Sequence, residues 1–294
     1  MGTMTATSAT LNATQDIPLD EESMLNSWAL LATPWPVLVI LSSYLGFVLW
    51  LGPSIMRQRK AMDLRHPMMV YNLYQVIYNG ALVGWFFTHS TAISYVIEHG
   101  CHPLDPKLNP LRTELHLASW CYLFAKIVDM IDTVFMILRK KDSHVTFLHL
   151  YHHTSMVAFS WLSVKYIQAE QGIILGVLNS FVHVVMYTYY FLAGLGPEVQ
   201  KYLWWKKYIT KLQLTQFVFA ISFMAYLLYN RCTVPQTQFV FAISFMAYLL
   251  YNRCTVPQVY NVIWVVNVAV IMALFVNFYI QTYIKKPAQI KKTE

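Results

Sequence analysis

The chain has 294 residues, of which 57% are apolar and only 12% are charged. A soluble globular domain carries about 25% charged residues, so the composition excludes the ordinary soluble classes and favours a membrane protein. The formal net charge of +7 comes from loops between apolar stretches, and a nucleic-acid partner therefore has little support.

Residues 1–27 are polar and contain no Lys or Arg, so they lack the basic region of a cleaved signal peptide. The apolar stretches that follow can each cross a hydrocarbon core of about 30 Å, which requires about 20 residues. We predict seven transmembrane helices, at residues 28–56, 67–97, 115–138, 145–164, 172–196, 212–230 and 259–284. The expected fold is an all-α, multi-pass membrane protein.

Lys and Arg residues concentrate in alternate loops between these segments. The loops that carry most of them are 57–65, 139–141 and 201–211, together with the residues from 285 onward. Since Lys and Arg accumulate on the cytosolic side, the N-terminus is predicted to be lumenal and the C-terminus cytosolic. Residues 287–294 then form a cytosolic tail ending in KKTE, which resembles the di-lysine signal that returns membrane proteins to the endoplasmic reticulum.

One segment is duplicated, because residues 215–236 recur as residues 237–258 without a single difference. The apolar core of each copy is short for a span, and only the first copy can extend backwards, through residues 208–216. Arg231 and Pro235 precede the second copy and block such an extension. We predict that the first copy spans the membrane and that the second is a surplus lumenal or folded-back segment. In the alternative, the second copy replaces the first as the span.

The fourth predicted span contains the sequence HLYHH at residues 149–153. His149, His152 and His153 have the spacing i, i+3, i+4, so a helix places them on one face. Ionisable side chains are costly inside a membrane and usually face an interior cavity. A single buried histidine is often an ordinary core residue, but three on one face favour chemistry.

Three further stretches, KIVDMIDT, LNSFVHVVMYTYY and YITKLQLTQ, place polar side chains at helical spacing. The second stretch adds a fourth imidazole, His183. A buried lysine near two carboxylates can be a charge-compensated structural pair or a substrate contact. Amides near a helix end can bind a polar head group or hold helices together, and Tyr and Met stripes are often plain packing. The residues that we assign to substrate binding are Lys126, Asp129, Asp132, Thr133, Asn179, Met186, Tyr187, Tyr190, Thr210, Gln213 and Gln216.

Clustered imidazoles in a membrane suit two kinds of enzyme. Membrane desaturases and hydroxylases bind two irons through histidine boxes that include HxxHH, because neutral imidazole suits iron. The chain has ten histidines, but only four are clustered, which is short of the ligands that a di-iron site needs. A neutral imidazole can also attack a thioester or act as a general base. A seven-helix receptor or transporter would explain the topology but not the histidines.

KIVDMIDT, HLYHH, HVVMYTYY and TKLQ, in this order and spacing, closely resemble the elongation of very long chain fatty acids family. The resemblance runs from about residue 34 to residue 286. It implies that residues 28–286 form a seven-helix catalytic domain, with six helices in an inverted barrel around an acyl tunnel. Asp129 departs from the pattern, since many relatives have Glu there, and so does the repeat.

The resemblance implies an acyltransferase of the endoplasmic reticulum, a very-long-chain 3-oxoacyl-CoA synthase. Such an enzyme condenses a long-chain acyl-CoA with malonyl-CoA to 3-oxoacyl-CoA, and it releases CO2 and CoA. No bound cofactor and no metal are expected, because reduction and dehydration fall to a ketoreductase, a dehydratase and an enoyl reductase. Those enzymes are candidate partners, and a homodimer is compatible with the family.

By resemblance, His152 matches the position proposed as the nucleophile that takes the acyl group. His183 is expected close by on a facing helix, with His149 and His153 orienting imidazoles or moving protons. The enolate oxygen needs hydrogen-bond donors such as these imidazoles or Asn179. Direct attack on the acyl-CoA, without a covalent intermediate, is the alternative.

Basic residues of the cytosolic loops are placed to meet the phosphates of CoA, namely Lys206, Lys207, Arg139 and Lys141. Ordinary positive-inside charge explains the same residues equally well. On the lumenal side, Cys101 is expected to pair with Cys232, as a similar pair does in the family, with Cys254 as the competitor. Cys121 lies within a span and is expected to stay free. Asn12, in Asn-Ala-Thr, is a predicted glycosylation site.

Overall fold

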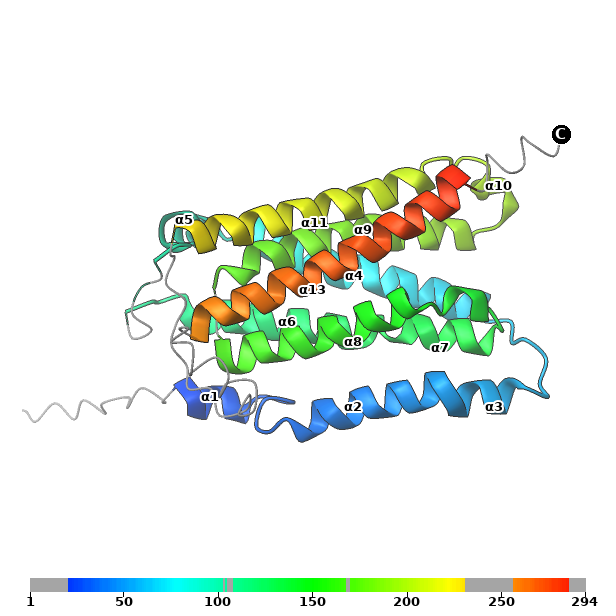
Figure 1. Ribbon diagram of the computed structural model, residues 1–294, viewed down its shortest axis with the longest axis horizontal. Helices are drawn as coiled ribbons and strands as arrows, with labels where there is room; N and C mark the ends of the chain where they lie inside the picture. The colour runs from blue at the N-terminus through cyan, green and yellow to red at the C-terminus, as the bar shows by residue number, and fades with distance from the viewer. Residues whose placement is uncertain (1–20, 103, 105–107, 168–169, 231–255, 286–294) are drawn as a thin grey trace, which may run out of the picture.

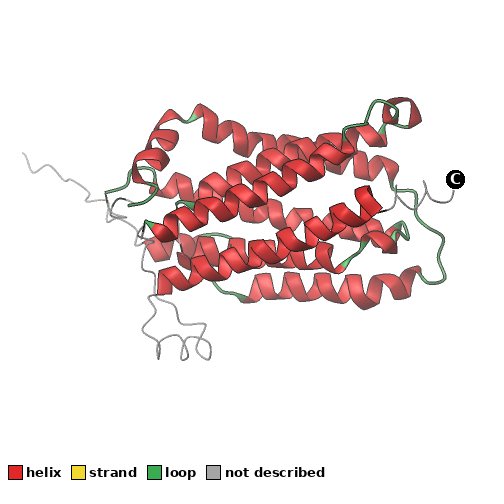
Figure 2. Cartoon of the chain, turned by 45° about the horizontal axis from the view of Figure 1, so that its top comes forward, coloured by secondary structure: helices red, strands yellow, loops and turns green. Residues whose placement is uncertain are grey.

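Helices build the whole of the regular structure in the computed structural model of this chain (Figures 1 and 2). The structure describes residues 21–102, 104, 108–167, 170–230 and 256–285. No strand occurs within these ranges. Several predictions fall outside the described residues, namely those for Asn12, Cys232, Cys254, most of the second repeat copy and the tail at 287–294.

The first half of the chain forms a short helix, one continuous helical stretch and two helical stretches that are each interrupted once. Its elements are α1 (Glu21–Ser27), α2 (Trp35–Gly46), the π-helical η1 (Phe47–Leu51), α3 (Gly52–Met56), α4 (Arg65–Thr88), α5 (Ser90–His99), α6 (Arg112–Asp129) and α7 (Ile131–Leu138). The second half follows with η2 (Asp142–His144), α8 (Phe147–Leu162), η3 (Ser163–Ile167), α9 (Gly172–Gly194), α10 (Pro197–Gln200), α11 (Lys206–Tyr229), α13 (Val256–Tyr279) and η4 (Ile280–Lys285).

Helix occupies each segment that we predicted as a span. Among the described residues, three helical stretches are long and apolar enough to cross a membrane, judged by length and composition: Trp35–Met56, Gly172–Gly194 and Ile263–Lys285. The protein is therefore an all-helical membrane protein with several candidate spans. The expected backward extension of the first repeat copy is also observed, because α11 begins at Lys206.

Three predicted spans depart from the observed helices for a local reason, since one begins later and two are interrupted. The helix of the first predicted span, α2, begins at Trp35 and not at residue 28, with Pro36 in the first helical turn, where proline needs no hydrogen-bond partner. The stretch predicted as 67–97 breaks at His89, whose Nδ1 accepts the backbone N–H of Ala92 and caps α5. The stretch predicted as 115–138 breaks at Met130, where the backbone tightens by bonding three residues back.

The bundle has two distinct ends. At one end, on the right of Figure 1, lie α10 and the C-terminal ends of α3, α7 and α13, which adjoin the basic loops. We call this the basic end. At the other end lie α1 and α5, and we call it the α5 end. The basic loops predicted to share one side of a membrane therefore do gather at one end of the molecule.

Helix α6 lies at the centre of the packing that positions the site. It contacts α4, α8 and α9, while α4 and α9 pack against each other along their lengths. Helices α11 and α13 form a second antiparallel pair, and α2 and α3 contact α8 and α7 at the edge of the bundle (Figure 1). Polar side chains on α6 are therefore held between three neighbouring helices.

Candidate active site

An ion pair on α6 forms the centre of the site. Lys126 Nζ lies 2.8 Å from Asp129 Oδ2, and each side chain is only 2% exposed. The ammonium also donates a hydrogen bond of 2.8 Å to Asn179 Oδ1 on α9 and lies 3.5 Å from Nε2 of His183. The structure therefore brings together four residues that two separate sequence motifs supplied, KIVDMIDT and LNSFVHVVMYTYY.

Asp129 has partners on both carboxylate oxygens. Its Oδ1 accepts hydrogen bonds from Gln75 Nε2 at 2.8 Å and from the Tyr187 hydroxyl at 3.2 Å. Its Oδ2 faces Lys126, and Nδ1 of His183 lies 3.4 Å from the same oxygen. That distance is within reach of an ion pair, but Nδ1 lacks the geometry of a hydrogen bond and is buried without one. The imidazole thus has one nitrogen toward the ammonium and the other toward the carboxylate.

Asp132 sits one helical turn from Asp129 in different surroundings. Its Oδ2 accepts a hydrogen bond of 2.8 Å from the Tyr187 hydroxyl. One hydroxyl proton cannot serve two acceptors fully, so Tyr187 is shared between the two carboxylates. Asp132 is partly exposed whereas Asp129 is buried, and none of the ion pairs among the described residues involves Asp132.

Helix α4 supplies site residues that the sequence reasoning missed. Tyr71, Gln75 and Asn79 are all buried, and their side chains form a row in which Gln75 bonds the Tyr71 hydroxyl at 2.8 Å. Asn79 Nδ2 in turn bonds the backbone carbonyl of Gln75 at 2.9 Å. The available signal was their four-residue spacing in an uncharged apolar stretch, which marks one helical face.

The histidines of α8 form a second group. His149 Nε2 lies 2.8 Å from Thr133 Oγ1, and Thr146 caps the start of the helix by accepting the His149 N–H. The rings of His149 and His153 have centroids 4.4 Å apart, and those of His152 and His153 are 5.4 Å apart. Within the described residues, the imidazoles of His152 and His153 make ring contacts but no hydrogen bond. Their nitrogens therefore keep hydrogen-bonding capacity that the neighbouring side chains do not use.

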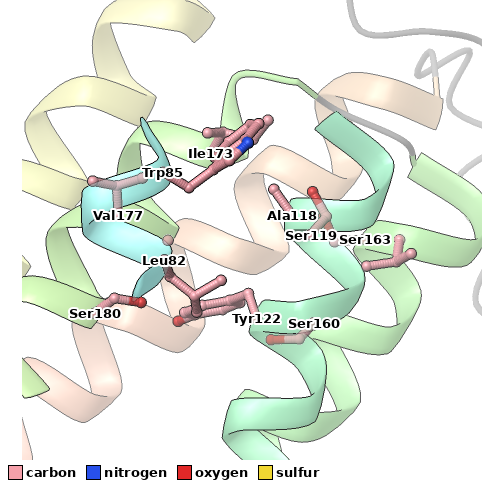
Figure 3. A pocket seen from close by; sticks show the side chains of 13 residues that line it. Leu82, Trp85, Ala118, Ser119, Tyr122, Ser160, Ser163, Ile173, Val177 and Ser180 are labelled. Atoms are coloured by element: carbon pink, nitrogen blue, oxygen red, sulfur yellow. The ribbon is translucent and has the colours of Figure 1, made fainter. Parts of the chain in front are cut away.

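A cavity of about 60 Å³ lies next to this centre, on its α5-end side. Its wall is mostly apolar and comes from α4, α6, α8, η3 and α9. Figure 3 shows Ser180, Tyr122 and Ser160 along one side of the cavity and Trp85 on the other. The Tyr122 hydroxyl bonds Asn179 Oδ1 at 3.0 Å, so one side of the cavity joins the polar centre directly.

The comparison with known proteins decides between the chemistries that the motifs leave open. The ELO family model, described as the GNS1/SUR4 family, matches residues 29–291. This chain belongs to the ELO family.

Named relatives of this ELO protein are fatty acid elongases. The chain is 36% identical to very long chain fatty acid elongase 4 of Homo sapiens over 274 residues, which is 92% of this chain and 78% of the relative. It is 37% identical to elongase 1 of Homo sapiens over 232 residues, covering 76% and 80% of the two chains. It is 40% identical to elongase 7 of Rattus norvegicus over 199 residues, covering 68% and 70%. The family resemblance drawn from the motifs is confirmed.

Several residues that we assigned to substrate lie away from the centre of this ELO protein. On α11, Gln213 Nε2 donates to Met186 Sδ of α9 at 3.5 Å, and Thr210 is buried. The Oε1 of Gln216 is buried without a hydrogen-bond partner. Tyr190 is 42% exposed and packs edge-on against the ring of Tyr187. These side chains face the α9–α11 contact and the basic end, where they do not join the ion-pair network.

The basic residues stay at the basic end. Lys206, Lys207 and Lys141 are exposed, and Lys207 Nζ lies 5.2 Å from the centroid of the Tyr208 ring. Arg139 is partly buried and directs Nη1 toward Met68 Sδ. Their positions suit contact with an anionic group arriving from that side.

A separate polar network, which we call the clamp, closes the α5 end of the ELO protein. Glu170 precedes α9, and its Oε1 accepts bonds from Arg112 at 2.7 Å and from Asn109 at 2.8 Å. Its Oε2 accepts a short hydrogen bond from the Tyr95 hydroxyl. All four side chains are buried. The sequence reasoning missed the clamp, because Glu170 and Asn109 lie in connections between helices.

The two described cysteines of this ELO protein differ in oxidation state. Cys121 is a free thiol, whereas Cys101 is disulfide-bonded, and the predicted partners Cys232 and Cys254 lie outside the described residues. In the part of the chain that the structure describes, no group of three or more His, Cys, Asp or Glu side chains is arranged to hold a metal ion.

Proposed function

We propose that this elongase condenses a long-chain acyl-CoA with malonyl-CoA to 3-oxoacyl-CoA, CO2 and CoA, the first step of fatty acid elongation. Membership of the ELO family supports an elongation enzyme and does not favour an oxidase or a receptor. The observation that carries the chemistry is the imidazole cluster of α8 and α9 at a buried cation. The rings of His152 and His153 make no hydrogen bond within the described residues, and the ring of His183 lies 3.5 Å from the Lys126 ammonium.

In the mechanism that we propose, His152 is the nucleophile. One ring nitrogen attacks the thioester carbonyl carbon, the carbon–sulfur bond breaks, and an acyl-imidazole and a CoA thiolate result. Malonyl-CoA then loses CO2, and its enolate carbon attacks the acyl carbon and releases the imidazole. Direct attack of the enolate on the acyl-CoA gives the same products without the covalent step.

The polar centre supplies the electrostatics of this reaction. The oxygen of the enolate carries developing negative charge, and fixed donors stabilise such charge best in a dry site. The ammonium of Lys126 lies 3.5 Å from the imidazole of His183 on α9, and it donates a hydrogen bond of 2.8 Å to Asn179. Asp129, with Gln75 and Tyr187 as donors, keeps the lysine in place and compensates its charge. His149, fixed by Thr133, orients the histidine face.

In this proposal the acyl chain binds in the cavity beside Tyr122. A site that holds benzene measures about 150 Å³, so the 60 Å³ seen here accommodates only part of a long chain. We propose that bound substrate widens it into an acyl tunnel that ends at the clamp. In this arrangement seven helices span the membrane and six form an inverted barrel around the tunnel.

The proposed topology places the basic end in the cytosol and the α5 end in the lumen of the endoplasmic reticulum. Most Lys and Arg residues then lie on the cytosolic side. Lys206, Lys207, Arg139 and Lys141 would meet the CoA phosphates, while reductase and dehydratase partners would take the product onward. No cofactor besides the two CoA substrates is needed.

An assay of the full chain in membranes tests this function. Membranes that express the protein are incubated with radiolabelled malonyl-CoA and stearoyl-CoA, with no reductant added. We expect labelled 3-oxoacyl product and release of CO2, both absent from membranes without the protein. Conversion of stearoyl-CoA that requires oxygen and a reductant, without uptake of the malonyl label, would contradict the proposal.

A further inference from the structure

Asp129 and Asp132, the two carboxylates of the site, differ in burial and in their hydrogen-bond partners. Asp129 is buried, faces the Lys126 ammonium at 2.8 Å and accepts bonds from two neutral donors. Asp132 is partly exposed and accepts one bond, from Tyr187, which also bonds Asp129. Two carboxylates joined through one hydroxyl do not both carry charge easily, and the one beside the cation keeps it. A proton that the pair holds therefore rests on Asp132.

Asp132 also lies on a defined side of the histidines. Along α9, Ser180 lines the cavity, His183 follows one turn later, and Tyr187 follows one turn beyond that toward the basic end. Asp132 bonds Tyr187, so it lies on the side opposite the cavity. A thioester whose acyl chain occupies the cavity directs its sulfur toward this side.

The reaction needs a proton on that sulfur. Condensation of an acyl-CoA with malonyl-CoA consumes one proton per turnover, because the CoA leaves as a thiolate and is released as a thiol. The requirement is the same for the covalent and the direct route. Resting on the proposed function, we propose that Asp132 is the acid that protonates the departing CoA thiolate.

The step balances in the following way. As the acyl carbon–sulfur bond breaks, its electron pair goes to sulfur, and the proton of the Asp132 carboxyl group moves to that sulfur. Asp132 becomes a carboxylate, and Tyr187 stabilises it through the 2.8 Å hydrogen bond. The partial exposure of Asp132 lets solvent return the proton before the next turnover. Asp129 takes no part in the transfer, since its charge remains paired with Lys126.

A change of leaving group tests this assignment in the purified full chain with malonyl-CoA present. Stearoyl-CoA is compared with the stearoyl thioester of 5-thio-2-nitrobenzoate. The aryl thiol of this compound is acidic, so its thiolate departs without needing a proton. For Asp132→Asn we expect thiol release from stearoyl-CoA to fall by about a hundredfold relative to the wild type. With the aryl thioester, the same variant should stay within about threefold of the wild type, because general acid catalysis is no longer required.

Two matched variants separate this role from a structural one. Asp129→Asn disrupts the ion pair, and His149→Gln removes the imidazole that bonds Thr133; both should lose activity equally with the two donors. If Asp132→Asn lost activity equally with stearoyl-CoA and with the aryl thioester, the proposal would be overturned. It would also be overturned if only His149→Gln showed activity that depends on the leaving group. Failure of the proposed function looks different, because the wild type itself would then release no thiol from stearoyl-CoA.

Discussion

Helix α6 carries a buried cation at each end, and the two networks around these cations differ in how completely they are satisfied. At the start of the helix, Arg112 belongs to the clamp, where both oxygens of Glu170 accept hydrogen bonds. At its end, Lys126 belongs to the polar centre, where Nδ1 of His183 and Oδ1 of Asn79 are buried without partners. Both networks are built on α6, so the difference in hydrogen bonding comes from the residues that surround each end of this helix.

We interpret the clamp as a stabilising network and the polar centre as the reactive one. A buried polar group without a partner costs roughly 1–3 kcal/mol, so proteins rarely keep one without a reason. The clamp bears no such cost at its carboxylate and holds the helix connections together. The polar centre keeps buried atoms without hydrogen bonds, and its Asn179 bonds Tyr122 of the cavity wall, so we expect a substrate to complete the missing interactions there. Mutations should therefore affect stability at one end of α6 and catalysis at the other.

The largest effect is expected at the histidine face. His152→Ala should lower condensation by at least about 10³-fold, because loss of a nucleophile removes the covalent route entirely. Its ring makes no hydrogen bond within the described residues, so thermal unfolding in detergent should change little. His144→Ala, at an exposed position of η2, is the matched control and should keep normal activity. Substantial product from a well-folded His152→Ala protein would remove His152 as nucleophile.

At the clamp, Glu170→Ala should act on stability. Glu170 Oε1 lies 2.7 Å from Arg112 Nη1, and removing one partner of such a buried pair typically costs about 3–5 kcal/mol. The comparison variant is Glu198→Ala, which breaks the exposed Lys201–Glu198 pair of similar length and should cost less than about 1 kcal/mol. Chemical or thermal unfolding of both variants measures the contrast. Equal stability of the two variants would show that the clamp does not hold the α5 end together.

A pair of isosteric substitutions gives the smallest and sharpest test. Asn109→Leu deletes a clamp donor to Glu170 and should cost about 1–2 kcal/mol of stability without changing turnover. Asn79→Leu removes an unsatisfied oxygen near the centre, so stability should hold. Turnover should fall, because the Gln75 side chain loses the 3.3 Å hydrogen bond that its Oε1 accepts from Asn79 Nδ2. Unfolding and initial rates are measured on both. The opposite pattern would reverse the assignment of the two networks.

Hydropathy and histidine spacing were enough to predict the helical membrane fold and the core of the site. The HLYHH and KIVDMIDT motifs work because residues three and four apart share a helical face, which requires no tertiary information. The break at His89 was missed, since a side-chain cap barely alters hydropathy. Gln75 was missed because a neutral amide in an apolar stretch resembles ordinary packing. Contact between Gln75 and Asp129 depends on how α4 packs against α6, and no local pattern encodes that.

Helices α11 and α13 pack against each other in antiparallel fashion, and this contact affects how well the protein tolerates extra residues between them. In the sequence, most of the second repeat copy lies between the end of α11 and the start of α13, outside the described residues. Once two helices are held by their own interface, lengthening the chain that joins them is inexpensive, since each doubling costs only about 0.6 kcal/mol. An in-frame duplication at this position can therefore persist without displacing the catalytic helices.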